Sequence, residues 1–312
     1  MKQSNAITQG ALYIAIYIVL LIATIFIPFL AIVSVFLLPI PFVIYTYKFG
    51  IKHSLIMFIA TIFVSMIVLS VFTLPVTVLS GLGGMAIGWA LNERKETYET
   101  WARGTIGFSL GLGFVYVLLQ FVFKVNWSEE IKLLLDDTLQ NTVKIFSQMG
   151  QELSEEAIRQ LREQLESFLY LIPTLIVIAG IVITFITLFF SYKIINRLDR
   201  QSFKFPEFRN FNLPSSIIWY YLIGIILLWI FNDPSETMYL AAVNIQGLTG
   251  FLLLLQGISF LFYFTHYKNW SKAIPISLII LLVLFPVLLL YPIRILGIID
   301  LGLQLRNRLT KS

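Results

Sequence analysis

The sequence predicts an all-α fold: a polytopic bundle of 8–10 transmembrane helices with an extracytoplasmic amphipathic helical hairpin. Composition is the first reason, because 58% of the 312 residues are hydrophobic and only 12% are charged, about half the charged share of a soluble domain. The second reason is that apolar residues form long runs without charge, such as 11–27 and 274–290, and about 18 such residues can cross a bilayer as a helix. The third is an acidic segment, 126–166, which holds nine acidic residues against four basic ones.

Nine apolar blocks follow one another along the chain. They cover residues 6–27, 30–47, 54–72, 75–91, 105–123, 168–192, 217–231, 238–267 and 273–303. Pro39 and Pro41 predict a short or kinked second span, and Pro173 predicts a bend in the sixth. The last block contains Pro286 and Pro292 and is too long for one untilted crossing. It forms either one span with an interfacial helix or a tight hairpin.

The positions of lysine and arginine predict the orientation of these spans. Basic connections at 48–52, 94–103, 193–209 and 268–272 alternate with neutral or acidic connections. Cytoplasmic loops carry the excess of lysine and arginine, so we expect a cytoplasmic N-terminus and an extracytoplasmic acidic segment. The basic residues after position 305 favour a cytoplasmic C-terminus, and therefore the hairpin in the last block.

The acidic segment has the pattern of two amphipathic helices. Ser128 can cap the first and Gly150 can end it, and Ser154 can begin the second. Such a hairpin either caps the bundle with its apolar stripe or acts as a lid over a binding site. The sequence therefore predicts three parts: an N-terminal bundle at 1–125, the hairpin at 126–167 and a C-terminal bundle at 168–312.

Glycine pairs at helical spacing are expected at close helix contacts. Gly84 and Gly88 in the fourth span and Gly107 and Gly111 in the fifth each form a small-xxx-small pair, and the two sets are expected to face each other. Such residues let helix backbones approach closely inside lipid. The alternative is that this glycine-rich backbone lines a cavity.

Uncharged polar residues inside apolar spans are the candidate ligand-binding groups. They are Gln120, Asn244, Gln246 and Gln256. Amides in a membrane either join helices by hydrogen bonds or line a pocket for an uncharged or weakly polar ligand. Two charged residues of the last block, Arg294 and Asp300, are six positions apart, too far for pairing within one helical turn, and are expected at the membrane interface.

No pattern of residues points to catalysis or metal binding. The chain has no cysteine and two histidines, and it contains neither a zinc-binding HExxH pattern nor a nucleophile elbow. We therefore expect no catalytic residue, no metal, no cofactor and no nucleic-acid partner. The protein is not predicted to be an enzyme.

Several segments resemble the YybS family of bacterial membrane proteins of unassigned function. They are 11–15 (ALYIA), 47–50 (YKFG), 74–84 (LPVTVLSGLGG), 296–300 (LGIID) and 306–308 (RNR). The resemblance implies a multi-pass protein of the bacterial cytoplasmic membrane. The N-terminal half is in turn distantly similar to the substrate-binding components of energy-coupling factor transporters. Those components bind vitamins or metal ions and dock on a membrane subunit through small residues of their first helix, a pattern that Ala11 and Ala15 match.

Two functional hypotheses follow. The first is a membrane protein that binds a small molecule in its N-terminal half as a transporter-like component of an uptake system, with the lipid bilayer, a membrane adaptor and ATPase subunits as partners. The second is a non-transport scaffold or regulator that acts through its basic cytoplasmic loop, 193–209. A cavity lined by polar residues from several spans would favour the first hypothesis over the second.

Overall fold

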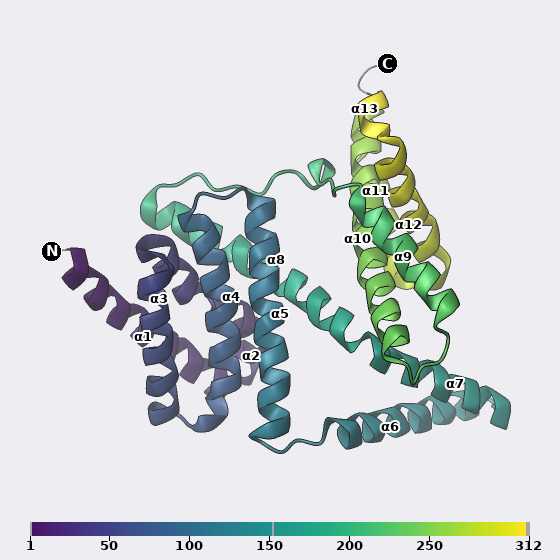
Figure 1. The fold of residues 1–312 in the computed structure, drawn as a ribbon, viewed down its shortest axis with the longest axis horizontal. Helices are drawn as coiled ribbons and strands as arrows, with labels where there is room; N and C mark the ends of the chain where they lie inside the picture. Colours follow the sequence, from purple (N-terminus) through teal and green to yellow (C-terminus); the bar gives the residue numbers. More distant parts are fainter. Residues whose placement is uncertain (1, 152, 310–312) are drawn as a thin grey trace. The chain divides into compact units, whose positions relative to one another are not determined.

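The computed structural model describes residues 2–151 and 153–309, in which every regular element is a helix (Figure 1). The predicted all-α class is confirmed. The chain forms two compact units, one made of residues up to Glu166 with Leu175–Phe205, and one made of Ser167–Thr174 with Pro206 onwards. Their longer helices are α1 (Lys2–Phe26), α2 (Pro28–Leu37), α3 (Ile40–Val68), α4 (Leu74–Asn92), α5 (Thr97–Phe121), α6 (Trp127–Gln148), α7 (Glu155–Ser167), α8 (Ile172–Asp199), α9 (Ser216–Ile230), α10 (Thr237–Tyr267), α11 (Ala273–Leu284) and α12 (Pro286–Leu303).

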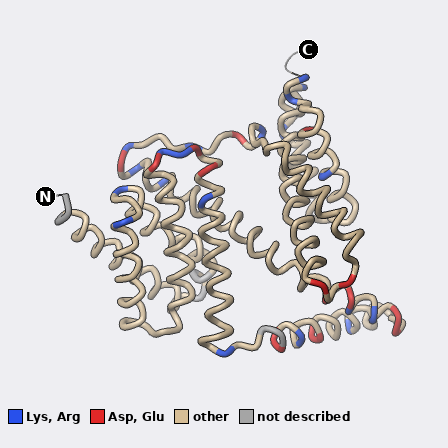
Figure 2. The backbone as a smooth tube through the Cα atoms, in the orientation of Figure 1, with Lys and Arg blue, Asp and Glu red and all other residues tan. Residues whose placement is uncertain are grey.

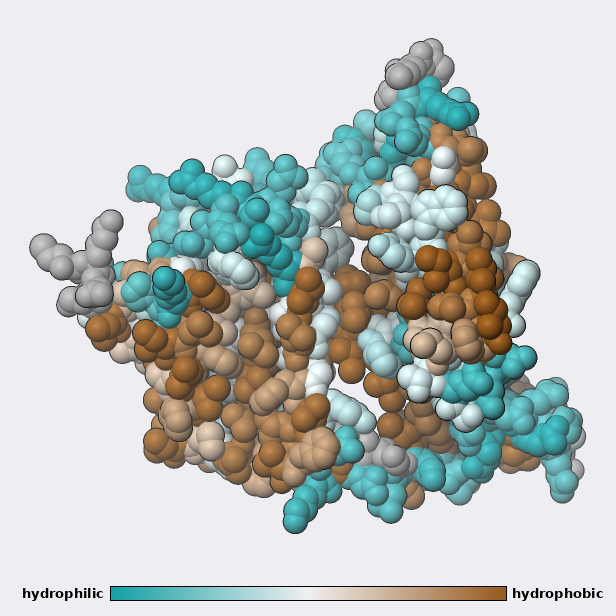
Figure 3. Space-filling model, in the orientation of Figure 1, coloured by the Kyte–Doolittle hydropathy of each residue, from teal (hydrophilic) through white to brown (hydrophobic). Residues whose placement is uncertain are grey.

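Within the described residues, seven helical stretches are long and apolar enough to cross a membrane. They are Asn5–Phe26, Ile32–Val68, Val71–Asn92, Thr97–Phe121, Glu155–Asp199, Thr237–Tyr267 and Pro286–Leu303. On the face drawn in Figure 3, each unit shows a broad band of hydrophobic side chains with hydrophilic residues beyond its ends. Such a band is what a lipid-embedded bundle requires, since hydrocarbon offers no hydrogen bonds to polar groups.

The predicted glycine pair of helix α4, Gly84 and Gly88, packs against the beginning of α3. A Cβ atom at Gly84 would lie 2.5 Å from the carbonyl oxygen of Pro39, and one at Gly88 would lie 2.5 Å from that of Val43. The prediction that Gly84 and Gly88 face the fifth span is therefore wrong. They make a close helix contact, but with the parallel segment that begins α3.

The chain reverses direction inside α3, at Gly50. This residue has φ 75° and ψ 173°, which are not helical values, and glycine adopts positive φ without a steric cost. Beyond it α3 runs antiparallel to α4, because the Thr77 hydroxyl donates to Ser65 (3.3 Å) and Gly81 faces Phe58. The long apolar stretch 32–68 is therefore two passes joined by one glycine.

The second predicted glycine pair joins α5 to α4. A Cβ atom at Gly107 would lie 2.8 Å from the carbonyl oxygen of Leu82, and one at Gly111 would lie 3.1 Å from the side chain of Leu79. Helix α4 is therefore contacted closely on two faces, by α3 and by α5, which lie beside it in Figure 1. The three helices form the centre of the first unit.

Most of helix α8, from Leu175 onwards, belongs to the first unit, whereas its first three residues belong to the second. The indole Nε1 of Trp101 donates to the carbonyl oxygen of Ile181 (2.9 Å), and Gly104 of α5 faces Thr184. The domain boundary predicted at residue 168 thus differs from the structure, in which residues 175–205 pack with the N-terminal helices. The order of the helices along the chain does not show that α8 packs with the N-terminal helices. Such packing depends on whether the surfaces of two distant helices have complementary shapes.

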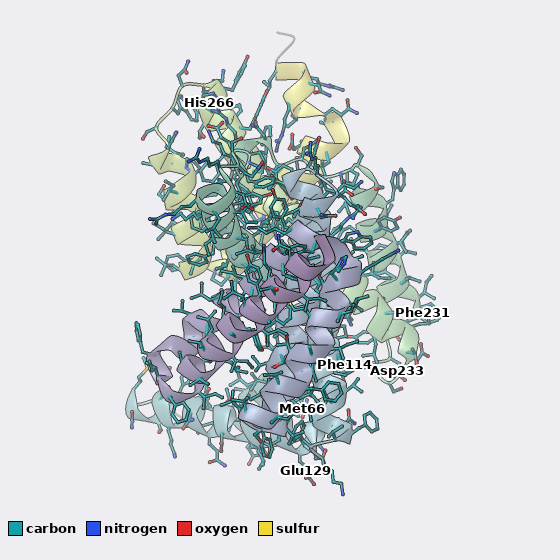
Figure 4. The ribbon with its side chains drawn as sticks, turned by 90° about the vertical axis from the view of Figure 1, so that its left-hand side faces the viewer. Met66, Phe114, Glu129, Phe231, Asp233 and His266 are labelled. Carbon is teal, nitrogen blue, oxygen red and sulfur yellow. The ribbon has the colours of Figure 1, made fainter. Side chains whose placement is uncertain are left out.

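The acidic segment forms the expected helical pair, α6 and α7. Helix α6 begins at Trp127, so its N-cap is Asn126 and not Ser128 as predicted, whereas the Ser154 hydroxyl does cap α7 by accepting from the Ala157 amide (3.2 Å). Arg162 of α7 pairs with Asp136 of α6 (3.0 Å) beside the buried Leu139. In Figure 4, Glu129 of α6 lies at the same end of the first unit as Met66 and Phe114.

The second unit is built on close, parallel packing of α10 and α12. Gly257 of α10 faces the carbonyl oxygen of Ile293, and Gly297 of α12 faces that of Leu253. Helices α11 and α12 are separated at Phe285, and Leu282 on one side of this break shares a buried cluster with Ile293 on the other. This arrangement corresponds to the hairpin alternative for the last apolar block.

The ends of both units differ in charge. In the first unit, lysine and arginine gather at the end of the bundle that carries the α4–α5 connection (Figure 2). In the second unit, acidic residues gather at one end, and lysine and arginine lie at the other (Figure 2). Figure 4 shows the same polarity, with His266 at the basic end and Phe231 beside Asp233 at the acidic end.

Candidate functional site

A polar cavity of about 300 Å³ lies at the basic end of the second unit. Its walls come from the loop before α9, from α10, from the end of α12 and from the short helix α13 (Leu305–Leu309). The lining residues are Arg209, Asn210, Asn212, Ser215, Tyr263, Asp300, Leu301, Gln304, Arg306 and Asn307.

A buried carboxylate forms part of the wall of this cavity. The side chain of Asp300 is 1% exposed, and its Oδ2 accepts from Nε2 of Gln256 (2.6 Å) and from Nε and Nη2 of Arg306 (both 3.0 Å). Burial of a carboxylate is costly unless it is paired and hydrogen-bonded, and three donors on one oxygen supply that compensation. The other oxygen, Oδ1, is buried and has no hydrogen-bond partner in the described residues.

Arg306 reaches Asp300 because the chain turns sharply at Gln304. Helix α12 ends there in the left-handed conformation (φ 48°, ψ 49°), and α13 begins at the next residue. The guanidinium also donates from Nη1 to the carbonyl oxygens of Arg209 (2.8 Å) and Phe211 (3.0 Å). It therefore joins the end of α12 to the loop that precedes α9.

Gln256 of α10 makes a second connection to the same loop. Its Oε1 accepts from the Leu213 amide (2.9 Å), while its Nε2 donates to Oδ1 of Asn212 (3.0 Å) as well as to Asp300. Gln256 is fully buried. The arrangement fixes the cavity wall before any ligand is bound, as a preorganised binding site requires.

The cavity offers two kinds of group to a ligand. The unpaired Oδ1 of Asp300 can accept a hydrogen bond from an ammonium, guanidinium or hydroxyl group. Asn210 and Ser215 are exposed side chains on the wall that can donate or accept. Arg209 is an ion-pair partner of Glu207. The cavity wall therefore presents both hydrogen-bond donors and acceptors.

None of the four predicted ligand-binding residues lines this cavity, although Gln256 is hydrogen-bonded to two residues that do, Asn212 and Asp300. Asn244 joins α10 to the beginning of α8, since its Oδ1 accepts from the Thr174 amide (3.0 Å) and its Nδ2 donates to the Tyr170 carbonyl (2.7 Å). Gln246 packs against Gly224 of α9. Gln120 is exposed at the end of α5, in the other unit. The four do not form one pocket.

Asp300 is buried near the end of α12, and Arg294 contacts Tyr221 of α9 and packs over Gly250 of α10. The partner of Asp300 is Arg306, which is also six positions away along the chain. The left-handed conformation of Gln304, which nothing in the sequence marks, brings the two side chains together.

A cavity in the first unit also lies at the basic end of its helices. It measures about 680 Å³ and is lined by residues that include Lys48, Arg94, Lys95 and Asp199. Lys48 and Asp199 form an ion pair across it (2.9 Å). The predicted ligand-binding residues do not contribute to this cavity. The small-residue pair predicted for docking, Ala11 and Ala15, is exposed on α1.

Comparisons with known proteins identify relatives but no activity. A family model described as "Predicted membrane protein (DUF2232)" matches residues 15–301. The chain is 28% identical over 309 residues to the uncharacterized protein YybS of Bacillus subtilis (strain 168), covering 99% of each chain. No solved structure matches. The resemblance to the YybS family is thus confirmed, while the similarity to energy-coupling factor components stays a prediction.

Proposed function

The chain belongs to the DUF2232 family of predicted membrane proteins, and we propose that it binds a small, positively charged or hydrogen-bond-donating solute as a transporter-like component. The observation that carries this proposal is the buried Asp300, whose Oδ1 has no partner within the described residues although the residue lines a polar cavity. An unsatisfied buried acceptor is costly. A donor group on a bound solute, or a water molecule in its absence, would remove that cost.

The location of the cavity refines the hypothesis drawn from sequence. The solute was expected in the N-terminal half, whereas the polar cavity with a preformed wall is in the second unit. A site at the basic end of the bundle, which we expect to be cytoplasmic, suits a component that receives or releases a solute on that side. The role is binding, and no step of catalysis is proposed.

Binding can be tested on the purified full-length protein in lipid nanodiscs. Thermal unfolding is measured with ammonium, ethanolamine, guanidinium and putrescine, because a ligand that binds only the folded state raises the unfolding temperature. Asn210→Trp fills the cavity without removing Asp300, Gln256 or Arg306, and Asn232→Trp at the opposite end is the matched control. A stabilising solute whose effect is lost in the first variant and kept in the second supports the proposal. If no amine stabilises the protein, or if both variants respond alike, the proposal fails.

Docking to a transporter's membrane subunit is a separate part of the proposal. Ala11 and Ala15 are exposed on α1, where they leave a shallow stretch of helix that another helix could approach closely. Affinity purification in mild detergent should recover an ATPase pair with its membrane adaptor. Replacement of both alanines by leucine should abolish the recovery while leaving the thermal stability unchanged.

The scaffold alternative also has an observation in its favour. The basic loop is held in a defined conformation, because Asn196 pairs with both the amide and the carbonyl of Phe203 (2.8 Å each) and leaves Arg200 and Lys204 exposed. A fixed, basic surface suits an acidic protein partner. Recovery of such a partner that is lost on Arg200→Glu and Lys204→Glu, without any solute effect, would favour this alternative.

A further inference from the structure

We propose that Arg294 is a membrane-embedded docking point for a transmembrane helix of another protein that carries an aspartate or glutamate. This proposal is independent of the solute cavity, since Arg294 is not among the residues that line it. It rests on the depth of the guanidinium, on its surroundings and on the distribution of acidic residues in the chain.

The guanidinium lies within the hydrocarbon layer. A Cβ atom at Gly250 would lie 2.9 Å from Cζ of Arg294, so the charged group is level with Gly250 of α10. Helix α10 has 31 residues, and about 20 residues cross the hydrocarbon layer. Every window of 20 residues within α10 contains Gly250, the fourteenth residue of the helix. The charge therefore lies at a depth that a lipid phosphate group does not occupy.

The groups around the Arg294 guanidinium use only part of its hydrogen-bonding capacity. Nη1 donates to the hydroxyl of Tyr221 (3.2 Å), and the guanidinium lies over the rings of Tyr221 (5.6 Å) and Tyr291 (5.4 Å). Its Nε is buried without a hydrogen-bond partner, and no carboxylate of the described residues forms an ion pair with it. An arginine at this depth is costly and is commonly paired. Within the described residues, the bundle that contains Arg294 supplies no carboxylate to pair with it.

A second copy of the chain cannot supply that group from its apolar spans. The chain has 17 acidic residues, and the predicted spans contain one of them, Asp300, which already pairs with Arg306. The others lie in the connections and in the hairpin. The missing anion must therefore come from a different molecule.

A partner helix fits the surface around Arg294 better than a small anion does. Arg294 lines neither of the two cavities described above. Its neighbourhood is an exposed apolar surface, with Tyr291 65% exposed and Val287 89% exposed on α12. An apolar helix with one carboxylate would cover this surface and place the acid beside the guanidinium. Charge-assisted hydrogen bonds of this kind are stronger than neutral ones.

The test uses synthetic transmembrane peptides and the full-length protein in lipid nanodiscs. Host helices of leucine and alanine carry Glu, Gln or Leu at their centre, and association is measured by energy transfer between fluorophores on peptide and protein. We expect the Glu peptide to bind about tenfold or more tightly than the Leu peptide. Arg294→Leu should remove this preference and Arg294→Lys should keep much of it. Arg308→Leu, outside the span, is the matched control and should have no effect.

Three results would overturn the proposal. One is equal binding of the Glu and Leu peptides to the unmodified protein. Another is a preference for Glu that persists in Arg294→Leu. The third is complete displacement of the Glu peptide by a small carboxylate such as hexanoate, which would assign the site to an anionic solute. Because Arg294→Lys retains the charge, it separates loss of docking from loss of the fold, and circular dichroism checks that each variant is helical.

Discussion

At the scale of single residues, the ion pair between Asp300 and Arg306 connects the elements at the basic end of the second unit. Gln304 leaves the helical conformation, and this reversal brings Arg306 back onto Asp300. The guanidinium then holds two carbonyl groups of the loop before α9. A buried pair of this kind is weak evidence of net stability, but removing one partner leaves an uncompensated buried charge.

We predict that Arg306→Leu destabilises the protein by about 3–5 kcal/mol, since Asp300 then stays buried without its cation. Adding Asp300→Leu should cost little more, or recover part of the loss. Thermal unfolding in nanodiscs measures both, with Arg308→Leu as the exposed control. Additive losses in the double variant would show that the two residues act separately.

At the scale of elements, glycines decide which helices touch. Gly257 and Gly297 bring α10 and α12 together, as Gly84 and Gly88 bring α4 to α3. The motifs on α4 and α5 could be recognised in the sequence, and so could the contact of Gly107 and Gly111 with α4, whereas the partner of Gly84 and Gly88 could not. A glycine in a membrane helix predicts that another helix packs closely against it. It does not predict which helix of the bundle makes that contact.

Gly257→Ala should cost about 1–3 kcal/mol, the range for overpacking a tight interior, because its methyl group would meet the carbonyl of Ile293. Gly113→Ala on α5 is the matched control, since a Cβ atom there has nothing within 4 Å. That change should leave stability unchanged or slightly raised. Equal losses in the two variants would contradict the role given to the α10–α12 contact.

The helical hairpin should depend on its apolar contact more than on its ion pair. Both partners of the Arg162–Asp136 pair are about half exposed, and such pairs contribute about 0–1 kcal/mol. Leu139 is 4% exposed, whereas Leu133 is 63% exposed. We therefore predict that Leu139→Asp speeds proteolysis between α6 and α7, while Leu133→Asp and Arg162→Gln do not. Faster cleavage of all three variants would argue against this packing.

At the scale of the whole molecule, charge is distributed along the axis of each unit (Figure 2). The basic ends carry the loops that sequence placed in the cytoplasm, and the acidic hairpin and the α9–α10 turn lie at the opposite ends of their own units. The positive-inside rule then gives one orientation for the chain. We therefore predict that the basic loops are cytoplasmic and that the acidic hairpin is extracytoplasmic.

The absence of native cysteine makes a direct measurement of this orientation straightforward. Single-cysteine variants Gln151→Cys in the hairpin and Ser202→Cys in the basic loop are made in the otherwise unchanged chain. In intact cells, a membrane-impermeant maleimide should label the first and not the second. After permeabilisation, both should react. Labelling of Ser202→Cys in intact cells would reverse the proposed topology.

The sequence by itself determined the class of this protein, most of its helices and the charge difference between their ends. These properties are local: helical hydrogen bonds join residues four apart, and hydropathy is a sum over one segment. Gln256, which supports the cavity wall through Asp300 and Asn212, was also recognised, because an amide inside an apolar run needs a partner wherever the helix packs.

Only the tertiary structure decided which segments meet. It placed α8 with the N-terminal helices, reversed the chain at Gly50, separated Gln120 from Gln256 and joined Asp300 to Arg306. Each of these depends on contacts between residues that are distant in the chain, or on a single left-handed backbone conformation. In lipid, where apolar faces gain little from one another, such choices come from shape and hydrogen bonding between helices, and a pattern read along one helix does not contain them.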